Sequence, residues 1–143
     1  ISNYKWQYTP QNVANTAGSL QLRSIDYAKY GQLYKNNGVW NGKQIISPDW
    51  VSKSLSKQMA ISDNEFYGNL FWNKTYKVGS DAYEVYYSSG NGGNRIYIFK
   101  DQPCIIVITS TAYNTLSGDK QVDKIMQNHL IPSIFKLQKY NLK

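Results

Sequence analysis

Residues 83–109 read YEVYYSSGNGGNRIYIFKDQPCIIVIT, and this stretch decides the fold class. Residues 83–88 alternate in polarity, which is typical of a strand with one buried face. The glycine-rich residues 90–93 interrupt this pattern, and residues 95–100 form a second strand pattern. Asp-Gln-Pro at residues 101–103 then predicts a turn. The stretch therefore predicts antiparallel strands that follow one another in sequence order.

The next run, residues 104–109, is apolar at almost every position. A strand with one solvent-exposed face alternates in polarity, whereas a strand covered on both faces does not. We therefore expect residues 104–109 to form a central strand. A further strand is predicted at residues 67–72, which are rich in aromatic side chains, and residues 1–17 also have a strand-like aromatic content.

A helix is predicted ahead of these strands. Ser24 is expected to be its N-cap, Asp26 lies in its first turn, and Asn37-Gly38 ends it. Its apolar stripe is expected to comprise Ile25, Ala28, Tyr30 and Leu33.

Residues 39–45 then predict a short hairpin, because Asn41-Gly42 supplies the two positive-φ positions of a type I′ turn. Ser47-Pro48 begins a second helix, with a capping serine followed by proline at the first helical position. The buried side of this helix is expected to comprise Trp50, Val51 and Leu55.

A last helix is predicted at residues 119–130, where apolar side chains recur at helical spacing. Pro132 is expected to end or kink it, and residues 133–140 to add a turn or two. The whole pattern predicts an α+β fold, in which helices flank an antiparallel meander. We expect residues 1–143 to form a single unit.

The composition excludes several classes of protein. The chain has 143 residues, of which 41% are apolar and 17% charged, as in one folded domain. No apolar run approaches the roughly 20 residues of a membrane-spanning helix, and no signal peptide is recognisable. With one cysteine, Cys104, and one histidine, His129, the chain cannot form an intrachain disulfide or a metal centre of cysteines or several histidines. We therefore expect no metal and no cofactor.

The formal net charge of +7 would suit an anionic partner such as nucleic acid. The lysines are scattered, however, and no four basic residues follow one another. A solvated basic surface is the simpler interpretation, so we expect no nucleic-acid partner. Salt-dependent association with DNA would reverse this expectation.

Residues 88–94, SSGNGGN, are the segment that suggests a binding site. A phosphate-binding loop places its glycines between a strand and a helix, but here a strand follows. Glycines let a ligand approach the backbone closely, and free strand N–H groups are natural donors to an oxyanion. From the residues alone, two interpretations stay open: a ligand-binding strand edge, or a hairpin with a flexible turn.

Five separated segments resemble the serine β-lactamase-related hydrolases of the class C, penicillin-binding-protein and esterase type, in the order of that family. They are residues 16–22, 26–34, 38–51, 67–72 and 86–99. The resemblance covers most of the chain and is specific, because several segments agree. It implies the C-terminal portion of a β-lactamase/DD-peptidase-like fold.

In that family, the serine of an S-x-x-K motif attacks an acyl carbonyl, a Y-x-N motif assists, and a K-T-G-like strand lines the site. The resemblance places the Ser-Ser-Gly of residues 88–90 at that strand, with the Ser89 backbone contributing to the oxyanion hole. The predicted substrate-binding residues are Ser88, Ser89, Gly90, Asn91, Gly92 and Gly93. Ser-Ser-Gly departs from Lys-Thr-Gly, which puts recognition of a β-lactam carboxylate in doubt.

Spacing matches to the other two motifs occur at residues 34–36, 54–57, 67–69 and 117–120. In the family, the nucleophile and the tyrosine motif come well before the segments found here, so all four matches lie in the wrong place. The resemblance therefore implies the C-terminal part of a hydrolase, with its catalytic serine and lysine expected upstream. We expect this chain to be inactive by itself.

The parent would act on a small acyl substrate: an ester, a peptide or a β-lactam. We expect the chain to expose apolar surface, which a complementary N-terminal segment or self-association would cover. By resemblance, the protein is expected in the bacterial periplasm or cell envelope. The alternative is a non-catalytic ligand-binding module of the same fold.

Overall fold

The computed structural model describes residues 1–16, 18–115 and 117–140, with side chains as far as residue 135. Its main element is a six-stranded sheet in the order β10-β9-β8-β7-β6-β5. The strands are β5 (Met59–Ser62), β6 (Glu65–Tyr67), β7 (Trp72–Val78), β8 (Asp81–Gly90), β9 (Asn94–Phe99) and β10 (Ile105–Ile108). Every neighbouring pair is antiparallel, so the predicted meander is confirmed.

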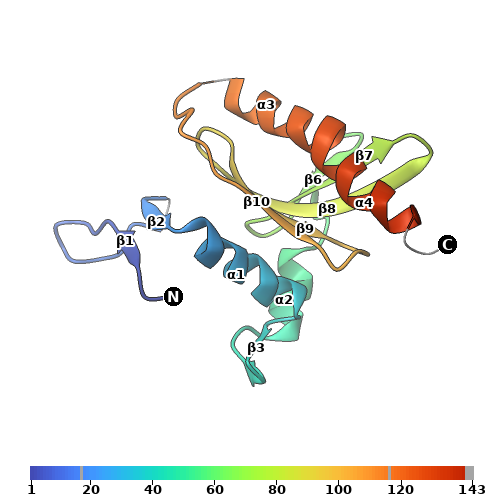
Figure 1. The fold of residues 1–143 in the computed structure, drawn as a ribbon. Helices are drawn as coiled ribbons and strands as arrows, with labels where there is room; N and C mark the ends of the chain where they lie inside the picture. Colours follow the sequence, from blue (N-terminus) through green and yellow to red (C-terminus); the bar gives the residue numbers. More distant parts are fainter. Residues whose placement is uncertain (17, 116, 141–143) are drawn as a thin grey trace.

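Helices cover both faces of this sheet (Figure 1). On one face lie α1 (Ser24–Lys35) and α2 (Pro48–Ser54). On the other face, α3 (Ser117–Ile125), the π-helical turn η1 (Met126–Leu130) and α4 (Ile131–Tyr140) follow one another as a continuous helix. The predicted α+β class is confirmed.

Strand β9 is buried on both faces. Ile96 and Ile98 pack against the α1–α2 layer, whereas Tyr97 and Phe99 pack against the α3–α4 layer. These four side chains are at most 2% exposed. Strand β9 therefore contributes side chains to both halves of the core.

The prediction that residues 104–109 form a central strand is wrong. Strand β10 stands at the end of the sheet, next to β9, and its four residues are half-buried. An apolar run on both sides of a strand reports what covers its two faces. It does not report whether a neighbour pairs with each edge, and here both helical layers extend over an edge strand.

The prediction of one strand at residues 67–72 is also wrong. Strand β6 ends at Tyr67 and β7 begins at Trp72. Between them the chain turns, with the Gly68 N–H donating to the Phe71 carbonyl at 2.8 Å. Phe71 is 1% exposed and packs in the α1–α2 half of the core. Its apolar character reflects burial in a turn rather than strand pairing.

Helix α1 differs from its prediction at two points. Its N-cap is Arg23, whose side chain does not cap the helix, rather than Ser24. Ile25 is 61% exposed and so lies outside the buried stripe. The helix instead approaches the sheet through Gly31, where an added Cβ would lie 2.8 Å from Ile96 Cγ2 and 3.1 Å from Ile105 Cγ2. A glycine permits this close approach, which a search for apolar side chains overlooks.

The segment that joins α1 to α2 follows its prediction. Strands β3 (Val39–Trp40) and β4 (Lys43–Gln44) form the hairpin, with Asn41 at φ 49° and Gly42 at φ 75°. Ser47 caps α2 by accepting a hydrogen bond from the Trp50 N–H at 3.2 Å. Trp50 itself is 42% exposed, so its predicted burial is wrong.

The last helix passes through Pro132. In the π-helical turn before it, the Ile131 N–H donates to the carbonyl of Met126. Proline lacks an N–H, and its ring crowds the preceding turn. A wider turn relieves that crowding, so the helix does not end at Pro132, and α4 supplies the further turns expected at residues 133–140.

The N-terminal hairpin stands apart from the sheet (Figure 1). It pairs β1 (Tyr4–Trp6) with β2 (Leu20–Leu22), and Ala17 lies outside the described residues. Its aromatic side chains are exposed: Tyr4 by 52%, Trp6 by 36% and Tyr8 by 55%. The expected exposed apolar surface is present in this hairpin.

Helix α1 carries a carboxylate that is removed from solvent. The side chain of Asp26 is 0% exposed and lies 2.6 Å from Lys29 Nζ and 2.7 Å from Arg23 Nε. Hydrogen bonds from Lys29 and then Arg23 lower the pKa of Asp26 to about 2. The charged form of Asp26 therefore stabilises the folded state.

We predict that Asp26→Asn lowers the free energy of unfolding at neutral pH. The folded-state pKa of about 2 lies below the unfolded value of 3.8, so the charge contributes fully above pH 3.8. That contribution disappears as the pH falls from about 4 through 2. Urea unfolding of both proteins between pH 2 and 7 measures this difference. A difference that stays constant across the range would show that the charge is not its cause.

Candidate functional site

Residues 88–94 end β8, form a turn and begin β9. Strand β8 outruns β7, because their last paired residues are Trp72 and Tyr87. Pairing with β9 continues further, to Gly90 and Asn94. The end of β8, from Ser88 to Gly90, therefore has a neighbour on only one edge within the part of the chain that the structure describes.

The direction of the backbone groups follows from the alternation of an antiparallel ladder. The Phe99 N–H donates to Cys104 on the β10 side at 3.1 Å. Because the direction of these groups alternates along a strand, the N–H and C=O of Ile96, three positions earlier in β9, point toward β8. There Ile96 pairs with Ser88, whose own N–H and C=O point toward β9. The N–H and C=O of Ser89 consequently point the other way, toward the β7 side, beyond the last residues that pair with β7. We call this pair of groups the Ser89 edge.

Helix α1 supplies a side chain to the same place. The hydroxyls of Tyr27 and Ser88 lie 3.1 Å apart, within hydrogen-bonding distance. Both residues are half-buried. Sequence reasoning missed Tyr27, because only the packing of α1 on the sheet joins positions 61 residues apart.

On the opposite face of the sheet, Ser89 is exposed and pairs in register with Arg95. The Arg95 guanidinium lies 2.8 Å from Asp119 and 3.4 Å from Asp123, and 4.8 Å from the centre of the Tyr87 ring. Arg95 is 5% exposed. It therefore fastens α3 to β9 and is not free to meet a ligand.

Two asparagines fix the turn that follows. Asn91 exchanges two hydrogen bonds with Asn114, at 2.8 and 2.9 Å. Asn94 exchanges two with the backbone of Ser110, at 3.0 and 2.9 Å. These hydrogen bonds hold the turn against residues 110–114. One of the two interpretations of the sequence, a hairpin with a flexible turn, does not include these contacts.

The glycines of the turn are packed against backbone. Gly92 has φ 79° and Gly93 has φ 86°. An added Cβ would lie 2.8 Å from the Ala112 carbonyl carbon at Gly92, and 2.8 Å from the Gly118 carbonyl oxygen at Gly93. Of the six predicted binding residues, the structure thus places Ser88, Ser89 and Gly90 at the strand end. Asn91 is exposed and bonded to Asn114, and Gly92 and Gly93 lie inside the fold.

The S-x-x-K spacing at residues 54–57 does not form a nucleophile and base pair. Ser54 is 0% exposed, and its hydroxyl has no hydrogen-bond partner. Lys57 forms an ion pair with Glu84 at 2.9 Å and lies 5.0 Å from the Phe66 ring centre. A fully buried hydroxyl cannot reach a substrate, so this match has no catalytic geometry.

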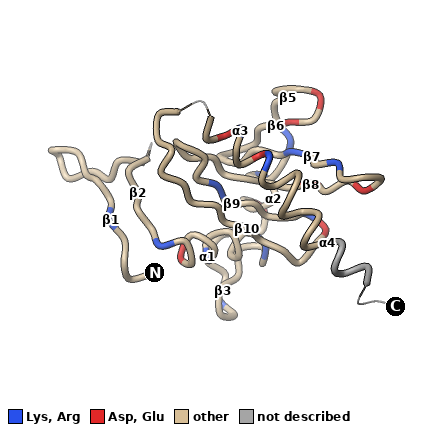
Figure 2. Tube along the Cα trace, turned by 45° about the horizontal axis from the view of Figure 1, so that its top comes forward, with Lys and Arg blue, Asp and Glu red and all other residues tan. Residues whose placement is uncertain are grey.

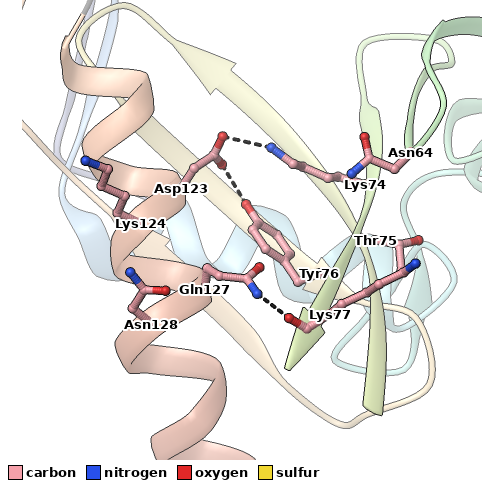
Figure 3. Close-up of a pocket in the computed structure, with 9 residues that line it drawn as sticks. All are labelled: Asn64, Lys74, Thr75, Tyr76, Lys77, Asp123, Lys124, Gln127 and Asn128. Atoms are coloured by element: carbon pink, nitrogen blue, oxygen red, sulfur yellow. Dashed lines mark hydrogen bonds and ion pairs between the residues drawn. The ribbon is translucent and has the colours of Figure 1, made fainter. Parts of the chain in front are cut away.

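Two grooves lie elsewhere on the molecule. One, of about 450 Å³, separates β7 from the α3–η1 helix (Figure 3). Within it Asp123 accepts hydrogen bonds from Lys74 at 2.8 Å and Tyr76 at 2.7 Å, and Gln127 donates to the Lys77 carbonyl. These contacts tie the helix to the sheet. The other groove, of about 430 Å³, lies between α1, α2 and the end of β9.

Three further features concern other kinds of site. Figure 2 shows basic residues distributed over several elements, among them β1, β7 and β9. No three His, Cys, Asp or Glu side chains form a metal-binding group within the described ranges. No helix among the described residues is long and apolar enough to cross a membrane.

Neither a protein-family model nor a curated protein matches this chain. The family therefore stays a prediction, which rests on the order of the motifs.

We predict that Gly93→Ala destabilises the fold more than Gly79→Ala. Both glycines have positive φ, at 86° and 62°. That conformation costs an alanine about 1–2 kcal/mol at either position. Gly79 has open space around it, whereas Gly93 meets Gly118 and Val122 within 2.8 Å. Overpacking adds about 1–3 kcal/mol at Gly93 alone. Equal losses in thermal unfolding would show that the turn is not packed as described.

The Ser89 edge predicts opposite results for proline at adjacent positions. Ser88→Pro removes an N–H that faces β9, which costs about 1–3 kcal/mol of stability. Ser89→Pro removes an N–H that faces no strand, and proline is tolerated at such edges. We expect the second variant to stay within about 1 kcal/mol of the parent chain in urea unfolding. The reverse order would place the free groups on Ser88.

Proposed function

We propose that this chain is the C-terminal part of an acyl-serine hydrolase of the β-lactamase-related type, with the corresponding portion of a β-lactamase/DD-peptidase-like fold. One observation carries the proposal: the Ser89 N–H and C=O point to a side without a strand. They do so in the segment that resembles the third motif of the family. Free backbone groups at a strand end suit an extended acyl substrate that pairs alongside it.

The chemistry divides between this chain and an upstream segment. A serine there attacks the acyl carbon, its proton passes to the lysine of the S-x-x-K motif, and the leaving group departs with a proton. Water then hydrolyses the acyl-serine bond. The Ser89 N–H donates to the carbonyl oxygen where negative charge develops. This chain therefore supplies one wall of the site and no nucleophile.

The polar groups beside the edge favour an uncharged substrate. Ser88 occupies the place of the lysine in Lys-Thr-Gly, and its hydroxyl lies 3.1 Å from that of Tyr27. Two neutral hydroxyls make hydrogen bonds but supply no cation for a carboxylate. An ester or amide without a carboxylate at this position therefore suits the site better than a β-lactam.

The exposed apolar residues fit a role for a further segment. Trp6 is 36% and Leu20 43% exposed on the N-terminal hairpin, and an isolated two-stranded hairpin is marginally stable in water. A complementary N-terminal segment would cover such a surface, with self-association as the alternative. Location in the periplasm or cell envelope rests on the resemblance alone.

The test begins with the reading frame ahead of Ile1, which is expected to encode Ser-x-x-Lys and Tyr-x-Asn. The longer protein should hydrolyse p-nitrophenyl acetate faster than the β-lactam nitrocefin, and alanine at that serine should abolish the reaction. Ser89→Pro should lower kcat by about 10²–10³, the usual loss of one oxyanion donor. Residues 1–143 by themselves should be inactive.

Different results would contradict the proposal. Turnover by residues 1–143 that Ser54→Ala abolishes would make the buried serine the nucleophile. Binding at the Ser89 edge without turnover by the longer protein would indicate a non-catalytic module. Association with DNA that weakens steeply with salt would indicate a nucleic-acid-binding protein.

A further inference from the structure

Leu70 adopts a backbone conformation that is unfavourable for its side chain. Its φ is 73°, in the left-handed region. That region costs an ordinary residue about 1–2 kcal/mol, and a branched side chain there is an outlier. The other non-glycine residues with positive φ in the described ranges are Asn12, Ser19, Asn37, Asn41 and Asn114. Leu70 is the one apolar residue in this group.

The hydrophobic core gives no reason for a leucine at this position. Leu70 is 65% exposed and belongs to neither core cluster. A glycine or asparagine would fit the backbone better. Strain that persists without a packing reason is a feature of functional sites.

The turn that presents Leu70 is firmly held. On one side, Gly68 lies so close to the carbonyl oxygens of Ser54 and Ser56 that a Cβ would overlap them. On the other side, Phe71 is 1% exposed in the core. Leu70 is therefore an exposed apolar side chain on a fixed backbone, which lowers the entropic cost of a contact with a ligand.

Leu70 also lies at the same end of the sheet as Ser89. The last β7–β8 pair is Trp72 and Tyr87. If that register continued, Leu70 would stand opposite Ser89. The register instead ends at Trp72, where the chain leaves the turn that contains the left-handed residue Leu70, and no strand among the described residues pairs with the Ser89 groups. Leu70 is thus an exposed apolar residue two positions from Trp72, as Ser89 is two positions from Tyr87, next to the last β7–β8 pair.

We propose that Leu70 determines substrate specificity, by contacting an aliphatic acyl chain whose carbonyl pairs with the Ser89 edge. The inference rests on the proposed function and names its substrate class: esters or amides of acyl groups longer than acetyl. Each methylene that the leucine removes from water favours binding, whereas the carbonyl contact is the same for every acyl length.

The experiment uses ¹⁵N-labelled residues 1–143 and three stable amides: N-methylacetamide, N-methylbutanamide and N-methylhexanamide. The Ser89 amide resonance reports binding. We expect the Kd to fall about twofold to fourfold for each added methylene. In Leu70→Asn, which suits the left-handed backbone, the Kd should change less than about twofold over the series. Ile45→Asn is the matched control, because Ile45 is 54% exposed on the β3–β4 hairpin.

The outcomes separate this inference from the proposed function. Shifts at Ser89 with no dependence on acyl length, or with the same dependence in Leu70→Asn, overturn the role of Leu70 and keep the edge. No shift at Ser89 with any amide overturns both. A dependence that Ile45→Asn also removes indicates general apolar adsorption and overturns the role of Leu70. So does a Leu70→Asn protein that melts below the parent, because it would show that Leu70 packs.

Discussion

The burial of strand β9 on both faces is the constraint on which the rest of this structure depends. Alternate side chains of this strand enter two separate core clusters, so both helical layers pack against the same strand. Arg95, at the start of the strand, extends this role with charge, because Asp119 and Asp123 hold it beneath α3. A buried cation is stable only when so paired, which fixes α3 above the turn at residues 91–93.

That fixed turn and the short β7 together create the candidate site. Hydrogen bonds from the side chains of Asn91 and Asn94 hold the turn in place, and the end of β8 is fixed with it. Strand β7 begins only at Trp72, after a turn that contains the left-handed residue Leu70, so it does not reach Ser89. An unpaired strand end invites pairing with other chains, and here it is confined to the residues that outrun β7. A short edge of this kind suits a small ligand.

The basic charge of the chain also has a structural use. Burial would raise the pKa of Glu84, but hydrogen bonds from Lys100, Lys57 and Asn73 hold it at about 2. Lys74 and Arg95 likewise pair with Asp123. These cations are committed to carboxylates between elements, so they stabilise the fold rather than form one basic surface.

The sequence by itself determined the fold class, the meander order and several local signals, among them the Asn41-Gly42 turn and the Ser47 cap. These follow from polarity periods and from backbone preferences, which neighbouring residues set. The tertiary structure alone decided which strand is central, because the faces of β10 are covered while one of its edges has no strand. It alone joined Tyr27 to Ser88 and freed Ser89, because contacts between distant segments and the end of a ladder leave no local pattern in the chain.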